Sequence, residues 1–292
     1  MKSSEKIIEK LIFISAAVSV AAVALITIFI FGKGLPILKE VGVIKFITGT
    51  TWSPTNGQYG ILPLISGTMA VTIGALIIGI PTGIGCAVFL AEVLGKRQAR
   101  FFKSAIELLA GIPSVVYGFF GLIVIVPLIR NVATAINPHA ATTGFSILAG
   151  AIILAIMILP TIVSISENAI SAVPKEYREA SLAIGADKRE TITKIILPAA
   201  KSGIFSSIIL GMGRAIGETM AVLLVTGNMA TMPDGPLSSV ATMTGTIAME
   251  MSYATPTHQQ ALFAIGIVLF LIIVVLNAIA QFTMKKLGGA GS

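Results

Sequence analysis

Six long stretches of apolar residues divide this chain, and they constrain its fold more than any other feature. They lie near residues 11–32, 63–91, 105–129, 145–170, 202–226 and 260–283. Each is long enough to cross a bilayer core of about 30 Å as an α-helix. Only 11% of the residues are charged, well below the roughly 25% of a soluble domain. The chain is therefore expected to be all-α, a polytopic membrane bundle of about six transmembrane helices.

Proline and glycine refine this expectation. Pro81 and Pro113 interrupt the second and third stretches, which predicts kinked or broken helices there. Glycine pairs four residues apart, Gly79/Gly83 and Gly213/Gly217, indicate close helix packing.

We divide the chain into three parts. Residues 1–62 form a first helix and an extracytoplasmic segment. Residues 63–284 form a transmembrane core with a cytoplasmic loop at 171–201, and residues 285–292 form a flexible tail. The polar, nearly uncharged loop 227–259 either re-enters the membrane edge, caps the pore or is an ordered surface loop.

The basic residues predict the orientation. Fifteen lie at the two termini and in the second-to-third and fourth-to-fifth connections, whereas the opposite connections hold four. The positive-inside rule places the richer side, with both termini, in the cytoplasm. An even number of spans requires the two termini to share a side, so the two arguments agree. The location expected is the plasma membrane of a prokaryote.

Several classes of function are excluded by what the sequence lacks. The net charge of +7 is explained by basic loops facing an anionic lipid leaflet, so membrane lipid rather than nucleic acid is the expected partner. Cys86 is the single cysteine, and no cysteine-based metal site is indicated. The chain has no glycine-rich phosphate-binding loop for ATP and no recognisable catalytic set. We expect no cofactor, metal or enzymatic activity in this chain alone.

The most charged part of the chain carries a specific pattern between the fourth and fifth stretches. Its marked positions are Glu179, Ala180, Ser181, Gly185, Leu197 and Pro198. Pro174 suits the start of a short helix, and Gly185 predicts a left-handed stop after it. Asp187 and Glu190 form a capping pattern for a second helix that ends near Leu197. Two short helices joined tightly to a span can act as a lever, although an amphipathic loop lying on the headgroups has similar features.

The spacing of this pattern resembles the loop by which permease subunits of ATP-driven (ABC) importers engage their ATPases. Other segments are similar to the phosphate-importer permeases, specifically the PstC type. These segments are 46–54, 59–63, 67–68, Ile106–Gly118, Gly213–Val222 and 227–228. Ser181 departs from the alanine common at that place, and a small serine is expected to fit. Together the matched segments cover roughly residues 46–228.

The resemblance implies a fold, a function and partners. The fold is that of a type I ABC importer permease, and the function is to form half of the pathway of a phosphate importer. The implied partners are a second permease of the PstA type, two PstB-type ATPases that use the ATP, and an extracytoplasmic PstS-type phosphate-binding protein. The residues implied in ATPase coupling are Glu179, Ala180, Ser181, Gly185, Leu197 and Pro198.

Charged residues inside the apolar stretches are the candidate substrate contacts. Arg214 and Glu218 lie four residues apart, which on one helix would permit an ion pair. They are either a structural pair or a pathway site in which Arg214 meets phosphate oxygens; the resemblance favours the pathway. Glu107 is a third candidate, for which an interfacial anchor is the stronger interpretation.

Alternative functions remain open at this point. A permease for another oxyanion, such as phosphonate or molybdate, would show the same features. An ATP-independent channel or carrier would be expected to show paired intramembrane acids and an inverted repeat, which are not evident. A membrane sensor would need a signalling domain for which six spans in 292 residues leave no room.

Overall fold

The structure, a computed structural model, describes residues 2–137 and 142–288, with side chains from residue 8 to 283 within those ranges. Five helical segments are long and apolar enough to cross a membrane: Ile8–Val41, Leu62–Val93, Ser114–Ile136, Ile147–Ser171 and Pro256–Thr283. A sixth is the pair Lys188–Ala199 and Lys201–Gly217, which is bent by 69°. The predicted all-α membrane bundle is confirmed.

The helices of the first half are α1 (Lys2–Val41), α2 (Val43–Thr48), α3 (Leu62–Val88), α4 (Lys96–Ala110), α5 (Ser114–Phe120) and α6 (Val126–Ile136). Those of the second half are α7 (Ile147–Ser171), α8 (Lys175–Ala183), α9 (Lys188–Thr191), α10 (Leu197–Ala199), α11 (Lys201–Gly217), α12 (Met220–Leu223), α13 (Met243–Glu250) and α14 (Pro256–Gly288). Three π-helical segments follow α3, α5 and α9: Phe89–Val93, Gly121–Ile125 and Ile192–Ile196.

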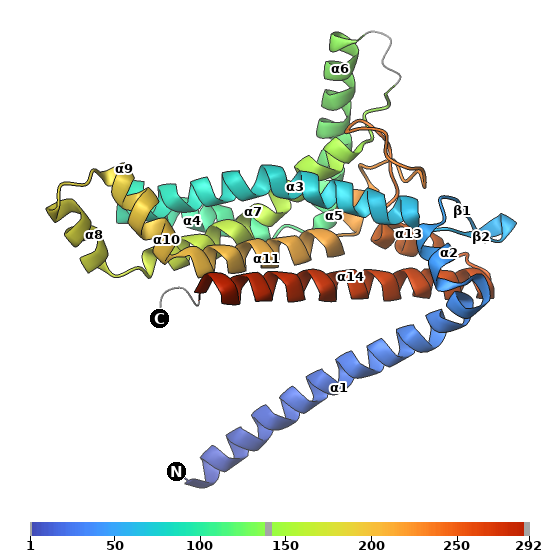
Figure 1. Cartoon of the computed structure of the whole chain (residues 1–292), viewed down its shortest axis with the longest axis horizontal. Coiled ribbons are helices and arrows are strands. Elements are labelled where there is room, and N and C mark those ends of the chain that lie inside the picture. Colours follow the sequence, from blue (N-terminus) through green and yellow to red (C-terminus); the bar gives the residue numbers. More distant parts are fainter. Residues whose placement is uncertain (1, 138–141, 289–292) are drawn as a thin grey trace.

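A small hairpin marks one end of the molecule. Strands β1 (Trp52–Ser53) and β2 (Gln58–Tyr59) pair antiparallel around a 3-10 turn at Pro54–Asn56. In Figure 1 the hairpin lies at the end opposite to α8, α9 and α10. Helix α14 continues to Gly288, so it includes part of the predicted tail, and residues 289–292 lie outside the described residues.

The third span differs from its predicted bounds of 105–129. Its first part is the amphipathic helix α4, which ends at Ala110, and a new helix starts only at Ser114. Pro113 has no N–H to continue the α4 ladder and disfavours a helical Ile112 before it, so the predicted break is confirmed there. In contrast, α3 continues through Pro81, so the second span is not broken at that proline.

The fifth span is shorter and more irregular than the predicted 202–226. Helix α11 ends at Gly217, Glu218 is extended, and the short α12 begins at Met220. The carbonyl of Glu218 accepts a hydrogen bond from the Thr244 hydroxyl at 2.8 Å instead of an intrahelical N–H. A hydroxyl from another part of the chain therefore satisfies the carbonyl that the helix break leaves without an intrahelical partner. Sequence periodicity does not reveal such a contact.

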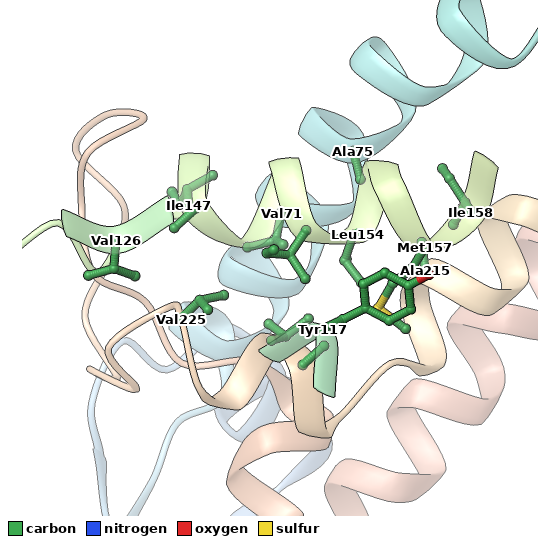
Figure 2. Packing of buried hydrophobic residues seen from close by; sticks show 14 of the residues in the cluster. Val71, Ala75, Tyr117, Val126, Ile147, Leu154, Met157, Ile158, Ala215 and Val225 are labelled. Atoms are coloured by element: carbon green, nitrogen blue, oxygen red, sulfur yellow. The ribbon is translucent and has the colours of Figure 1, made fainter. Parts of the chain in front are cut away.

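Helix α7 lies at the centre of the main core, between α3, α5, α11 and α12 (Figure 1). Its Ile153, Leu154 and Ile158 are almost fully buried, and Figure 2 shows Leu154 and Met157 beside the Tyr117 ring from α5. Gly79 and Gly83 face Ile158 and Ile162 closely, as the glycine spacing predicts. Beta carbons placed at Gly213 and Gly217 would meet nothing within 4 Å, so this second pair makes no such contact within the described residues.

A second core joins the end of α1 to α14 near the hairpin. Ile37 and Phe46 are buried there with Leu262 and Ile265. The earlier part of α1 diverges from α14 (Figure 1), and none of its most apolar window is buried within the chain. That surface is therefore available to lipid or to another subunit.

The loop after the fifth span folds back on the bundle. Val240 and Met243 are fully buried, and the Met243 N–H donates to the Thr68 hydroxyl of α3 at 3.0 Å. The Glu250 carboxylate accepts a hydrogen bond from the Trp52 indole at 3.1 Å and lies 2.7 Å from His258 Nε2. This carboxylate therefore ties the hairpin to α13 and the start of α14.

Candidate coupling lever and translocation site

The predicted pair of short helices is present at one end of the bundle. Gly185 has a φ of 90°, the left-handed stop expected after α8. Asp187 and Glu190 form a complete capping box at the start of α9, with the Glu190 N–H donating to Asp187 Oδ1 at 2.7 Å. We call residues 174–200 the lever. Its local geometry is the one that the sequence predicts.

The two arms of the lever are joined by a buried hydroxyl pair. Ser181 Oγ and Thr191 Oγ1 lie 2.9 Å apart, and the side chains are 6% and 3% exposed. The serine thus adds a hydrogen bond that alanine cannot make. Leu197 packs toward the bundle, whereas Glu179, Ala180 and Pro198 are exposed. The predicted coupling residues therefore differ in exposure. Ser181 and Leu197 hold the lever together and against the bundle, whereas Glu179, Ala180 and Pro198 are on its surface.

The exposed surface of α8 and of Ile184, the residue that follows it, is unusually apolar. Tyr177 is 52% exposed, Leu182 is also 52% exposed, and Ile184 is 87% exposed. Inside the lever, Ile196 and Ala200 are buried against Ile170 and Ala87, at the ends of α7 and α3. The lever is therefore fixed to two spans on one side and offers an apolar surface on the other.

An ion pair that the sequence reasoning missed anchors the lever. Arg178 of α8 bonds the Glu92 carboxylate after α3, with its Nη2 2.5 Å from Oε1. The same guanidinium donates to the carbonyls of Val173 and Ile170 at the end of α7. One side chain thus joins the lever to two spans. The available signal was Glu92 itself, a lone acid at the end of a long apolar stretch.

Gly185→Val is expected to abolish coupling without preventing membrane insertion. A β carbon at Gly185 would meet no atom within 4 Å, so the cost comes from the left-handed backbone rather than from a clash. The β-branched residue should redirect α9 away from α8. The measurement is ATP-driven uptake and ATPase stimulation, normalised to the amount of inserted protein.

Gly185→Asn is the matched control, because asparagine tolerates the left-handed region far better than valine does. It should retain most of the uptake. Equal, near-normal activity of the two variants would show that the turn geometry is irrelevant to coupling.

Arg214 and Glu218 do not form the predicted helical pair. Because α11 ends at Gly217, Glu218 leaves the helix face that Arg214 occupies. Glu218 Oε1 instead accepts a hydrogen bond from the Ala221 N–H, at the start of α12. The expectation that both lie on one helix face is wrong, and within the described residues no carboxylate lies at ion-pair distance from Arg214.

The helices that follow the two breaks, α5 and α12, pack on each other. A β carbon at Gly118 of α5 would lie 3.0 Å from the Ala221 α carbon of α12. Tyr117 donates from its hydroxyl to the Leu109 carbonyl, near the end of α4, at 2.7 Å. Arg214 is half-buried and lies within electrostatic range of Tyr117. Non-helical backbone at membrane depth is tolerated where it is buried in protein or lines a polar path.

Hydroxyl groups surround the Glu218 break. A gap there, too small to admit a water molecule, is bounded by Glu218, by apolar side chains and by threonines of α3 and of the segment around α13, namely Thr68, Thr72, Thr242 and Thr244. These threonines were not singled out from the sequence, because buried threonines are common in membrane helices. Glu107, the third candidate, is exposed on α4 and away from this gap.

Comparison with known proteins gives a consistent result. Residues 79–288 match the family model described as binding-protein-dependent transport system inner membrane component. The chain is 42% identical over 260 residues to the probable ABC transporter permease protein YqgH of Bacillus subtilis, which covers 87% of this chain and 82% of that protein. It is 34% identical to the phosphate transport system permease protein PstC of Xylella fastidiosa, over 94% of this chain and 90% of that one.

Solved structures share the fold at low identity. A bacterial alginate ABC transporter matches with a TM-score of 0.62 at 16% identity, covering 94% of each chain. The inward-facing MetNI methionine ABC transporter matches with a TM-score of 0.61 at 16% identity, covering 81% of this chain and 99% of the other. The fold, the lever and the family match agree: the chain belongs to the family of inner membrane components of binding-protein-dependent transport systems, multi-pass permeases that act with separate ATPase and binding-protein partners.

Proposed function

We propose that this chain is one permease subunit of an ATP-driven importer of inorganic phosphate. The observation that carries the substrate class is Arg214, a half-buried guanidinium in the last turn of α11, next to the break in that span, with no carboxylate to neutralise it among the described residues. A guanidinium offers several donors to phosphate oxygens in a fixed geometry. The similarity to phosphate transport permeases over most of the chain supports the same substrate.

The proposed complex contains four further proteins. A second, PstA-type permease completes the pathway, two PstB-type ATPases dock on the levers, and a PstS-type protein delivers phosphate from outside. The chain itself holds no cofactor in this scheme, because ATP is bound and hydrolysed by the ATPases. The exposed Tyr177 and Leu182 of α8, with the exposed Ile184 directly after it, support ATPase docking at that surface.

The function is tested by isolating the complex from native membranes through this chain. We expect an ATPase, a second permease and a phosphate-binding protein to accompany it. In proteoliposomes, uptake of radiolabelled phosphate should require ATP and the binding protein, and unlabelled phosphate should compete far better than phosphonate or molybdate. Stronger competition by either of those anions would assign the importer to another oxyanion, and uptake without ATP would exclude an ABC mechanism.

We also propose that both termini lie in the cytoplasm with the lever. In Figure 1 the first turns of α1 and the last turns of α14 point toward the end that carries α8, and the hairpin lies at the other end. The basic residues of the N-terminus, α4 and the lever are then all on the inner side, as the positive-inside rule requires.

Thiol labelling of single cysteines in a Cys86→Ser background checks this topology. Cysteines replacing Asn56 and Asp234, both exposed, should react with an impermeant reagent in intact cells. Cysteines replacing Lys96 and Lys188, also exposed, should react only after the membrane is permeabilised. Labelling of the Lys188 position from outside would reverse the orientation.

A further inference from the structure

A cleft lies where the lever meets the spans. It has a volume of about 1480 Å³, partly open to solvent, and is bounded by the end of α3, by α4, by α7 and by α8. Its charged lining residues are Glu92, Lys96, Arg100, Lys103, Glu167, Lys175, Arg178 and Glu179. The cleft lies far from Arg214 in the chain, and its α4 residues are at the opposite end of that helix from the break.

The charges of the cleft do not balance. Two of its cations are neutralised, because Arg178 pairs with Glu92 and Lys103 pairs with Glu167. The remaining Lys96, Arg100 and Lys175 face a single further acid, Glu179, and none of these four has an ion pair within the described residues. The cleft therefore has an excess of two positive charges, which favours an anion with several oxygen atoms.

The wall formed by α4 adds an apolar flank. Phe101 is 71% exposed and Leu108 is 75% exposed on the same helix that supplies Lys96 and Arg100. The basic residues are at the start of α4, and the apolar ones continue toward the membrane-spanning part of the third span. A basic pocket at the inner membrane boundary beside an apolar surface is the arrangement that receives the headgroup of an anionic lipid.

We propose that this cleft binds a phosphate group, held by Arg100, Lys175 and Lys96. The group belongs either to an anionic phospholipid, which the flank on α4 favours, or to free phosphate in the cytoplasm. The cleft is also lined by the Glu92–Arg178 pair, which holds the lever, and by the Lys103–Glu167 pair, which joins α4 to α7. A bound phosphate group would therefore lie next to the ion pair that fixes the lever to the spans. The proposal does not depend on which solute the importer carries.

The binding test uses the full chain in nanodiscs of phosphatidylcholine that contain a small fraction of spin-labelled phosphatidylglycerol. The cleft variant is Arg100→Gln with Lys175→Gln. The matched control is Arg97→Gln with Lys10→Gln, since both residues are exposed, basic and outside the cleft. The loss of two directed contacts should weaken retention of the immobilised lipid about tenfold or more, and the control should change it less than threefold.

A second arm separates free phosphate from lipid. Equilibrium binding of radiolabelled phosphate is measured in pure phosphatidylcholine nanodiscs, in an Arg214→Gln background that removes the proposed pathway contact. Selective loss of lipid retention in the cleft variant identifies a lipid site, and selective loss of phosphate binding identifies a free-phosphate site. Equal behaviour of the cleft and control variants toward both ligands overturns the proposal. The charge-preserving variant Arg100→Lys with Lys175→Arg should retain binding, because the positive charge of the cleft is unchanged.

Discussion

Replacing Arg214 by glutamine is expected to lower phosphate uptake by the assembled importer at least tenfold, with normal assembly. Arg214 is half-buried in the last turn of α11, next to the break in that span and within electrostatic range of Tyr117, and the described residues give it no carboxylate partner. Glutamine keeps some donors but removes the charge. A hydrogen bond to a charged group contributes about 1.5–3 kcal/mol, so its loss in the pathway corresponds to roughly a tenfold to hundredfold effect. The measurement is binding-protein-dependent phosphate uptake, normalised to purified complex.

Three variants make this result interpretable. Arg214→Lys retains the charge without the planar fork and should keep part of the uptake. Arg130→Gln removes an exposed arginine of α6 and should leave uptake unchanged. Glu218→Gln preserves length and an acceptor for the Ala221 N–H, so assembly should survive.

The alternative of a structural Arg214–Glu218 pair predicts a different pattern. In that case Arg214→Gln would strand a buried carboxylate and impair assembly, and adding Glu218→Gln would restore both assembly and transport. The structure separates the two residues by the end of α11, so we expect no rescue. Full uptake by the double variant would eliminate Arg214 as a phosphate contact.

The parts of the site that sequence predicts well are those specified by neighbouring residues. Gly185, Asp187 and Glu190 determine a left-handed stop and a capping box through atoms at most a few residues apart. The apolar stretches likewise follow from the bilayer thickness. Local signals of this kind need no knowledge of the packing, so the lever and the number of spans could be predicted from the sequence.

The remaining features depend on contacts between distant segments. The end of α11 is stabilised by Thr244, which lies after the following loop, and Arg178 meets an acid from the end of the second span. Helical periodicity continues through residue 218 and therefore placed Arg214 and Glu218 on one face. A sequence pattern reports what a segment prefers alone, whereas hydrogen bonds from elsewhere decided where this helix ends.

The Glu92–Arg178 pair leads to the second large expected effect. Glu92→Gln should strongly reduce ATP-driven uptake and uncouple it from ATPase activity, while the amount of inserted protein stays near normal. The Glu92 and Arg178 side chains are only 8% and 22% exposed. Breaking a buried pair costs about 3–5 kcal/mol because a charge is left without its partner. Because the pair lies at the lever, we expect its loss to displace α8 from the ends of the spans and to leave the bundle core folded.

The Lys194→Gln variant is the matched control, because it breaks an ion pair in the same lever whose side chains are 70% and 45% exposed. Exposed pairs contribute at most about 1 kcal/mol, so coupling should change little. Arg178→Gln should resemble Glu92→Gln or be worse, since it also removes the donors to the Val173 and Ile170 carbonyls. The double variant should be no more defective than Arg178→Gln alone, because the two side chains act as one unit. Additive defects, or normal coupling in Glu92→Gln, would show that the lever is held by the apolar contacts of Ile196 and Ala200 and not by this ion pair.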